Sequence, residues 1–124
     1  MSGHASIVSF RESVEPQRSV PEAGRLISGS PRVTAWNYYA EESGQFFAGI
    51  WEATRGSWRV RYTEHEFCHL LSGRVVITSE QGVRSEFSPG DSFVIPAGFS
   101  GVWEVLEDCR KLYAVFERAD SARR

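Results

Sequence analysis

The sequence predicts an all-β domain, and three observations support this prediction. Between about Phe46 and Phe116 the chain consists of segments in which apolar and polar residues alternate, as in strands with one buried face. These segments are separated by short groups of turn-forming residues rich in Gly and Pro. The connections between them leave no room for a helix. We therefore expect antiparallel β-structure throughout this region.

The N-terminal part of the chain is predicted to be an arm. Residues 1–24 mix charged residues with Pro16, Pro21 and Gly24 and show no sustained periodicity, apart from a short candidate strand at Ala5–Phe10. Region 29–42 contains Trp36, Tyr38 and Tyr39. We expect it to form a loop or a strand that packs over the rest of the domain.

The remaining elements follow in order. Residues 45–51 and 57–62 alternate clearly and are predicted to be strands. A long segment, 62–73, ends in Ser-Gly, and a second, 90–105, contains Pro-Ala-Gly. Between them, 74–79 and 83–87 flank Glu80-Gln81-Gly82 as a hairpin. Residues 110–116 alternate again, which gives one domain over 25–117 and a polar tail, 118–124, that should fray.

Two spaced motifs resemble those of the cupin superfamily. The first is Glu66, six residues and Gly73; the second is Gly90, five residues, Pro96, one residue and Gly98. Over 47–117 the sequence more narrowly resembles the small single-domain cupins grouped with ureidoglycine aminohydrolase and the ethanolamine-utilisation cupin. The resemblance implies a double-stranded β-helix, or jelly-roll, barrel with an N-terminal arm.

Length and composition exclude several classes of protein. A chain of 124 residues with 41% hydrophobic content builds one core, and a net charge of −2 lacks the basic excess that nucleic-acid binding requires. No apolar run has the length of a membrane span or the pattern of a signal peptide, so we expect a cytoplasmic protein. The two cysteines, Cys68 and Cys109, are expected to be free, buried thiols.

Strand alternation divides the side chains between two faces. If Glu66 points into the barrel, as the resemblance implies, then Tyr62, Glu64, Cys68 and Leu70 share its face, and backward parity adds Trp58 and Val60. The opposite face then carries His65, Phe67, His69 and Leu71. The resemblance also turns two later sets inward: Gly101, Trp103 and Val105, and Cys109, Lys111, Tyr113 and Val115.

The metal ligands of metal-binding cupins are missing from the motif. In those proteins His-x-His precedes the glutamate by three or four residues, and a third histidine follows the Pro-x-Gly motif by three. Here these positions hold Val60 and Tyr62, or Arg59 and Arg61, and then Gly101. His65 and His69 share a strand face but lie about 13 Å apart, too far to bind one ion, and are interpreted as sheet or interface residues. His4 lies in the arm. We predict no metal and no other cofactor.

The inward face predicts a pocket that combines aromatic walls with charged groups. Glu66 and Lys111 are the candidate catalytic or ligand-binding pair, and the alternative is a structural ion pair with the tryptophans as core. The predicted pocket residues are Trp58, Tyr62, Glu64, Cys68, Trp103 and Tyr113.

Three hypotheses for the function remain open. The first is a metal-independent cupin that binds a small polar metabolite: a carboxylate, an amine or an amino-acid derivative. The second is an enzyme resembling ureidoglycine aminohydrolase that uses Glu66 and Lys111 or a non-standard metal site. The third is a non-catalytic interaction module with a filled barrel. An exposed strand face at Phe67 and Leu71, together with the arm, also predicts a homodimer.

Overall fold

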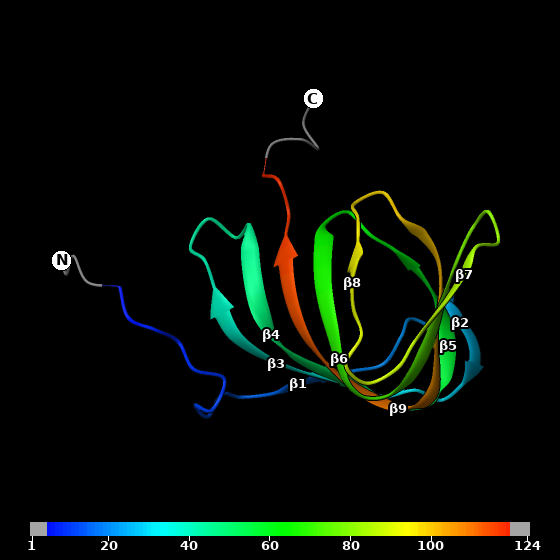
Figure 1. Cartoon of the computed structure of the whole chain (residues 1–124), viewed down its shortest axis with the longest axis horizontal. Coiled ribbons are helices and arrows are strands. Elements are labelled where there is room, and N and C mark those ends of the chain that lie inside the picture. Colours follow the sequence, from blue (N-terminus) through cyan, green and yellow to red (C-terminus); the bar gives the residue numbers. More distant parts are fainter. Residues whose placement is uncertain (1–4, 120–124) are drawn as a thin grey trace.

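The computed structural model describes residues 5–119, and within them it contains nine strands and no helix (Figure 1). The strands are β1 (Gln17–Ser19), β2 (Leu26–Gly29), β3 (Val33–Ala40), β4 (Phe46–Ala53), β5 (Gly56–Arg61), β6 (His65–Ser79), β7 (Arg84–Phe87), β8 (Ser92–Ile95) and β9 (Ser100–Phe116). All pairings are antiparallel. The all-β prediction is confirmed.

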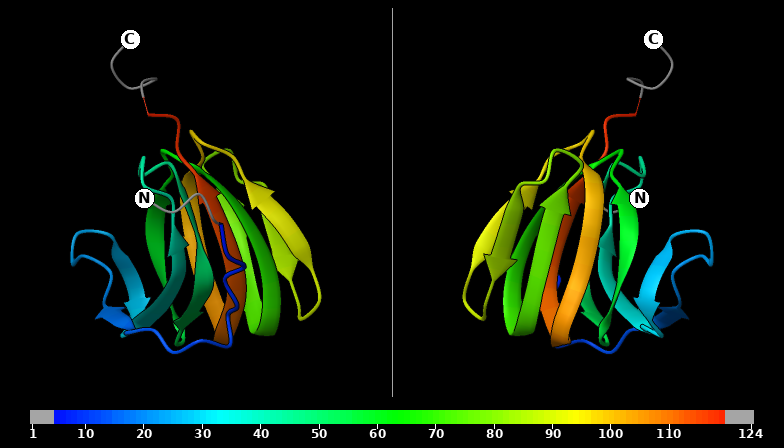
Figure 2. Two further views of the ribbon diagram at one scale, coloured as in Figure 1. Left: turned by 90° about the vertical axis from the view of Figure 1, so that its left-hand side faces the viewer. Right: turned by 90° about the vertical axis from the view of Figure 1, so that its right-hand side faces the viewer.

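The two longest strands, β6 and β9, pair along almost their whole length and belong to two sheets at once. The first half of β6 and the second half of β9 join β8, β4, β3 and β1 in sheet I. The strand order is β8, β6, β9, β4, β3, β1. Their other halves join β7, β5 and β2 in sheet II, in the order β7, β6, β9, β5, β2. The two sheets curl toward one another as in a jelly-roll barrel (Figures 1 and 2).

The bend between the sheets depends on one glycine. The β6–β9 register shifts repeatedly between Leu70 and Val75, the region that holds Gly73. Gly73 has a φ of 87°, and a Cβ built on it would lie 2.4 Å from the carbonyl oxygen of Asp108. Only glycine satisfies both conditions, so this motif residue sets the angle at which β6 passes from sheet I to sheet II.

The core fills the end of the barrel around this bend. Leu70 and Val75 have no exposed surface, and burying a side chain of this kind contributes about 1.5–3 kcal/mol. The Phe87 and Phe93 rings stack with centroids 3.8 Å apart and close the side between β7 and β8. The buried cluster comprises Ala53, Trp58, Cys68, Leu70, Val75, Ile77, Ile95, Trp103, Val105 and Cys109.

The N-terminal arm differs from the prediction. Ala5–Phe10 is not a strand, because these residues pair with no neighbouring strand; Ile7 is 92% exposed. Instead β1, in the arm, pairs with β3 and extends sheet I, and β2, which follows the arm, pairs with β5 and extends sheet II. Of the two alternatives for region 29–42, a loop or a strand, the structure shows a strand: β3 covers residues 33–40. Residues 120–124 of the predicted tail, and His4, lie outside the described residues.

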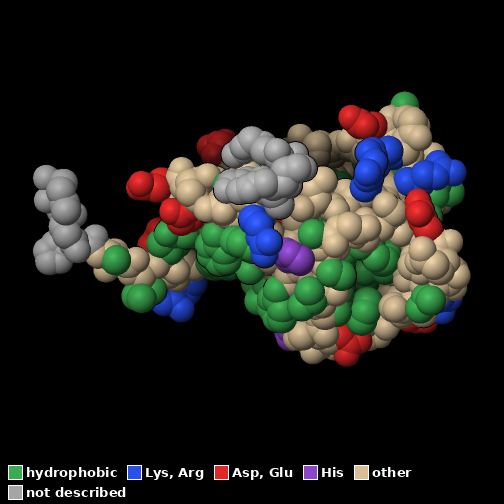
Figure 3. All heavy atoms as spheres, turned by 90° about the horizontal axis from the view of Figure 1, so that it is seen from above, with side chains coloured by type: hydrophobic (Ala, Val, Ile, Leu, Met, Phe, Trp, Pro, Cys, Tyr) green, Lys and Arg blue, Asp and Glu red, His purple; other side chains and the backbone are tan. Residues whose placement is uncertain are grey.

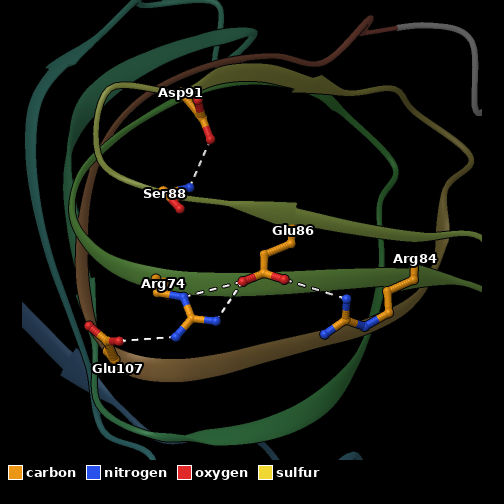
Figure 4. A network of polar contacts seen from close by, with 6 residues as sticks. All are labelled: Arg74, Arg84, Glu86, Ser88, Asp91 and Glu107. Carbon is orange, nitrogen blue, oxygen red and sulfur yellow. Dashed lines mark hydrogen bonds and ion pairs between the residues drawn. The ribbon is translucent and has the colours of Figure 1, made fainter.

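An exposed network of charges ties the outside of the bend together (Figure 4). Arg74 on β6 contacts Glu86 on β7 at 2.6 Å and Glu107 on β9 at 3.2 Å, and Arg84 approaches Glu86 at 3.5 Å. The hydrogen bond to Arg74 lowers the pKa of Glu86, and the same bond raises the pKa of Arg74. This network links three strands at the surface without entering the barrel.

Candidate ligand-binding site

A pocket of about 330 Å³ lies between the two sheets. Five strands from both sheets contribute side chains to it, so it exists only when β4 and β5 are held on opposite sides of β9. Its walls are mainly aromatic, with a few polar groups between the rings. The lining residues are Ala35, Trp51, Trp58, Val60, Tyr62, Glu66, Trp103, Lys111, Tyr113 and Val115.

The charged centre of the pocket is the pair predicted from the sequence. Lys111 Nζ lies 2.8 Å from Glu66 Oε2, and the side chains are only 3% and 10% exposed. The pair forms because Glu66 lies near the start of β6, opposite Val115, and Lys111 lies four register pairs further on, opposite Leu70. Both side chains therefore project from the same inner face of sheet I.

Aromatic rings enclose the ammonium group of Lys111. Its Nζ lies 4.4 Å from the ring centroid of Trp103 and 4.5 Å from that of Trp51, within the range of cation–π attraction. It also donates a hydrogen bond to Cys68 Sγ at 3.5 Å. The ammonium therefore contacts a carboxylate, two aromatic rings and a thiol. Glu66 retains a small exposed surface, which borders the pocket.

Burial and the nearby charges keep Lys111, Cys68 and Tyr62 protonated near neutral pH. Burial alone would lower the pKa of Lys111, but the Glu66 carboxylate, with Cys68 and Tyr62, raises it above its usual value. Burial raises the pKa of the Cys68 thiol to about 12 and also raises that of the Tyr62 phenol. Lys111 is therefore charged, and Cys68 and Tyr62 are neutral.

Tyr113 is fixed by residues from the neighbouring strands. Its hydroxyl donates a 2.7 Å hydrogen bond to Asn37 Oδ1 on β3, and burial raises its pKa to about 12. Gly49 on β4 leaves room for it, because a Cβ there would lie 2.7 Å from the Tyr113 hydroxyl. Trp103, another lining residue, has a buried Nε1 without a hydrogen-bond partner among the described residues.

Six of the eight predicted site residues line this pocket: Trp58, Tyr62, Glu66, Trp103, Lys111 and Tyr113. Cys68 does not line it; it is fully buried beneath Lys111. Glu64 does not line it either, because residues 63–64 form a bend between β5 and β6, and the Glu64 carboxylate accepts hydrogen bonds from the backbone amide and hydroxyl of Thr63. The strand alternation assumed for Glu64 ends at this bend.

Trp51 and Ala35 were not predicted. Trp51 on β4 lies opposite Lys111 in the ladder, and Ala35 on β3 lies opposite Trp51. The alternation of 45–51 identified the strand but not its buried face. Knowledge that β4 pairs with β9 would have placed Trp51 beside Lys111.

The residues at the positions of the metal-ligand motif do not form a metal site. Among residues 5–119 no three His, Cys, Asp or Glu side chains converge as a metal site would require. A Cβ at Gly101 would lie 2.1 Å from the carbonyl oxygen of Thr78, so no side chain fits there on this backbone. His65 Nδ1 accepts a hydrogen bond from the amide of Ala97, and His69 Nδ1 bonds to Ser92 Oγ, both away from the pocket.

A second hollow of about 340 Å³ adjoins the pocket at its mouth. The two share Trp58, Val60, Tyr62 and Glu66. The rest of the mouth is charged and is formed by Pro21, Arg25, Arg59, Arg61 and Glu64. Arg25 pairs with Glu22 at 3.4 Å, whereas Arg59 and Arg61 have no ion-pair partner among the described residues. The mouth is therefore positive in a chain whose net charge is −2.

The curled antiparallel sheets and the pocket between them define a cupin-type barrel. A family model described as the EutQ-like cupin domain matches residues 40–113, which is more than half of the chain. The chain belongs to this family. The narrower relation to ureidoglycine aminohydrolase remains a prediction.

Solved structures agree with this assignment. A protein of unknown function of the DUF861 family from Pseudomonas syringae pv. tomato is 26% identical, with a TM-score of 0.76 over 87% of this chain and 46% of the other. This chain thus spans less than half of that relative. The EutQ protein of Clostridium difficile is 24% identical, with a TM-score of 0.64 over 80% of each chain.

Two further comparisons are narrower. A predicted oxalate decarboxylase from Thermotoga maritima is 18% identical, with a TM-score of 0.68 over 91% of this chain and 100% of the other, and shares only the fold. No curated protein matches the sequence. In the described part of the chain, no helix could cross a membrane.

Proposed function

We propose that this protein binds a small polar metabolite inside the barrel, without a metal. The observation that carries the proposal is the pocket of about 330 Å³ between the sheets, with charged and aromatic groups on its walls. A filled barrel, as the interaction-module hypothesis requires, would leave no such space. The size suits a ligand of a few to about twenty heavy atoms, since ligand pockets commonly measure about 300–1,000 Å³.

The two ends of the site favour different ligand groups. In the pocket, Glu66 offers a carboxylate that is 10% exposed, and Trp51 and Trp58 offer apolar faces; Glu66 and Trp58 also border the mouth. At the mouth, Arg59 and Arg61 offer unpaired guanidinium groups, which suit a carboxylate. An amino-acid derivative, with an N–H donor at one end and a carboxylate at the other, satisfies both ends.

The site is better suited to binding than to proton transfer. A lysine that acts as a general base needs a lowered pKa, whereas the pKa of Lys111 is raised by Glu66, Cys68 and Tyr62. The same lysine is enclosed by Trp51, Trp103 and Glu66 and has little surface left for a substrate. These observations favour the binding hypothesis over the enzyme hypothesis.

The test is a thermal-shift screen followed by calorimetry on the intact chain. The panel contains amino acids and N-acyl amino acids, each beside its amide and its decarboxylated amine. Compounds that bind should lose at least tenfold in affinity in Glu66→Gln, whereas Glu80→Gln, the same change in the exposed β6–β7 turn, should leave affinity unchanged. If no compound binds, or if binding survives both Glu66→Gln and Trp58→Ala, the proposed function is wrong.

The mouth is tested separately with Arg59→Ala/Arg61→Ala. We expect this variant to weaken carboxylates while leaving their amides unaffected, and added salt should reduce the difference between acid and amide. Arg55→Ala, which removes an exposed arginine from the β4–β5 turn, is the control. Equal losses for acid and amide would disprove the role of the mouth while leaving the pocket proposal intact.

A further inference from the structure

A separate cavity of about 150 Å³ lies between the sheets at the edge formed by β7 and β8, and we call it the edge cavity. Its lining residues are Ile77, Ser79, Val83, Ser85, Phe87, Phe93, Val94, Ile95, Pro96 and Phe99. None of them carries a charge, and none of them lines the pocket around Glu66 and Lys111. The edge cavity is therefore distinct from that pocket in both place and chemistry.

The edge cavity exists because the barrel wall is open between β7 and β8. Within the described part of the chain, each of these two strands pairs with β6 and with no other strand. Phe87 on β7 lies opposite Val75 of β6, and Phe93 on β8 lies opposite Cys68. Val75 and Cys68 have no exposed surface, so both phenylalanine rings project to the buried side of their sheets.

Aromatic rings separate the edge cavity from the ligand-binding pocket. The Phe93 ring stacks on Phe87 with centroids 3.8 Å apart, and it lies 6.4 Å from the ring of Trp103, which lines the pocket. Phe99, in the β8–β9 loop, meets the ring of Tyr62 edge to face at 6.4 Å. These rings form a wall between the two spaces, so each space can be occupied without the other.

The edge cavity offers few partners to water. The Ser79 hydroxyl oxygen already accepts a 3.1 Å hydrogen bond from the amide of Val83. The Ser85 hydroxyl makes no hydrogen bond to another described residue. A buried water needs two to four polar partners, which these two hydroxyls do not supply. The cavity therefore suits an apolar molecule that carries a single hydrogen-bonding group.

The size and the lining of the edge cavity select an aromatic ring. An apolar cavity of about 150 Å³ lined by Leu, Ile and Phe is large enough to bind benzene. Here Phe87, Phe93 and Phe99 supply rings, and aromatic pairs attract one another in offset and edge-to-face arrangements. Ile77 and Ile95, which are only 6% and 3% exposed, supply buried aliphatic surface.

The shape of the cavity, rather than apolar surface as such, marks it as a site. Exposed apolar side chains occur elsewhere: seen from above, they gather over one side of the molecule (Figure 3). The edge cavity differs because both sheets line it, so an occupant contacts side chains on more than one of its faces. A small molecule fits such a space better than a flat macromolecular surface does.

We propose that the edge cavity binds a small uncharged aromatic molecule, of about the size of one six-membered ring, whose hydroxyl group bonds to Ser85. The proposal is independent of the proposed function, because the edge cavity and the pocket share no lining residue.

An NMR titration of the isotope-labelled intact chain with phenol tests the proposal. We expect saturable shifts of the Ile77 and Ile95 methyl signals, with nuclear Overhauser effects between these methyls and the phenol ring. Cyclohexanol, which keeps the hydroxyl but lacks the aromatic ring, should bind roughly threefold more weakly. Benzoate should not bind there, because nothing in the lining compensates a buried charge. Shifts that do not saturate, contacts only with residues of the pocket, or equal affinity for cyclohexanol or benzoate would overturn the proposal.

Variants of Ser85 supply a second measurement. Ser85→Phe places a ring in the cavity and should abolish phenol binding while the circular dichroism stays that of the parent. Ser30→Phe makes the same change at an exposed position between β2 and β3 and should bind phenol as the parent does. Ser85→Ala keeps the cavity open and should weaken phenol roughly threefold while leaving toluene unaffected.

Two results from these variants contradict the proposal. One is phenol binding that survives in folded Ser85→Phe, and the other is an equal effect of Ser85→Ala on phenol and toluene. If Ser85→Phe does not fold, Ser85→Ala and the contacts of phenol with Ile77 and Ile95 in the parent decide.

Discussion

Two ion pairs join the same two strands, β6 and β9, but one is buried and the other is exposed. Glu66 on β6 meets Lys111 on β9 inside the barrel, and Arg74 on β6 meets Glu107 on β9 outside it. The first pair is nearly sealed from water, whereas the Arg74 and Glu107 side chains are about half exposed. Removing one partner of an exposed pair costs little free energy, because water solvates the remaining charge. In the barrel little water reaches the remaining charge, so the same change costs much more. Burial therefore decides what each pair contributes.

The largest effect should come from breaking the buried pair. Lys111→Met leaves the Glu66 carboxylate without its ammonium partner, and removing one member of a buried pair costs about 3–5 kcal/mol. Glu66→Leu should cost a similar amount for the same reason. Urea denaturation of each variant measures the free energy of unfolding.

The double variant Glu66→Leu/Lys111→Met separates the two explanations of that loss. It leaves no unpaired charge, so it should recover part of the stability that either single change removes. Additive losses would show that the two side chains do not interact as the 2.8 Å contact indicates.

A smaller and more gradual effect should follow an increase in pH. Folding raises the pKa values of five groups, and each of them in its protonated form therefore stabilises the folded state: Lys111, Tyr62, Cys68, Cys109 and Tyr113. Their contributions are complete below the ordinary pKa of each group and decline as pH rises toward the folded pKa. The loss should begin near pH 9 for the thiols, near pH 10 for the tyrosines and near pH 10.5 for Lys111, and each group then reduces the stability by up to about 1.4 kcal/mol per pH unit.

Denaturation curves at pH 7, 9 and 10.5 measure this alkaline loss. Cys68→Ala/Cys109→Ala removes the first two groups to titrate, because burial raises the pKa of both thiols from an ordinary 9.0, to about 12 for Cys68 and about 11 for Cys109. The loss in this double variant should begin at higher pH than in the parent. Identical profiles would show that the thiols are not protected by burial.

The smallest effect is expected in the exposed network. Arg74→Ala removes the contacts to Glu86 and Glu107, yet the change in urea midpoint should be close to the error of the measurement, because all three side chains are more than one third exposed. In 1 M NaCl, where the Debye length is about 3 Å, even that difference should vanish. The loss in Lys111→Met should persist in the same salt. An Arg74→Ala effect as large as that of Lys111→Met would remove the distinction between the two sites.

Much of the barrel interior could be predicted from the sequence because strand alternation needs only one reference residue. With Glu66 turned inward, parity placed Trp58 and Tyr62 correctly, and the resemblance turned Lys111 and Tyr113 toward the same space. Alternation fails at bends, which is why Glu64 lies at the mouth and not in the pocket itself. Alternation also does not report how deeply a side chain is buried. It therefore could not show that Cys68 lies beneath Lys111.

The parts that could not be predicted depend on which strands pair. Trp51 joins the site only because β4 lies beside β9, and no local pattern reports that neighbour. The first two strands could not be predicted for the same reason: β1 and β2 are three and four residues long and are strands only because β3 and β5 supply partners. Ala5–Phe10 has a comparable pattern but no partner.

The continuity of β6 and β9 through both sheets has a consequence for folding. Their pairing can start at Ser79 and Gly101, close to the β6–β7 turn, and then proceed toward His65 and Phe116, with each new pair closing only a short additional loop. Because this ladder passes through the bend at Gly73, neither sheet can complete its pairing without the other. We therefore expect the amides of β6 and β9 to exchange with solvent last and together, and the barrel to unfold as one cooperative unit.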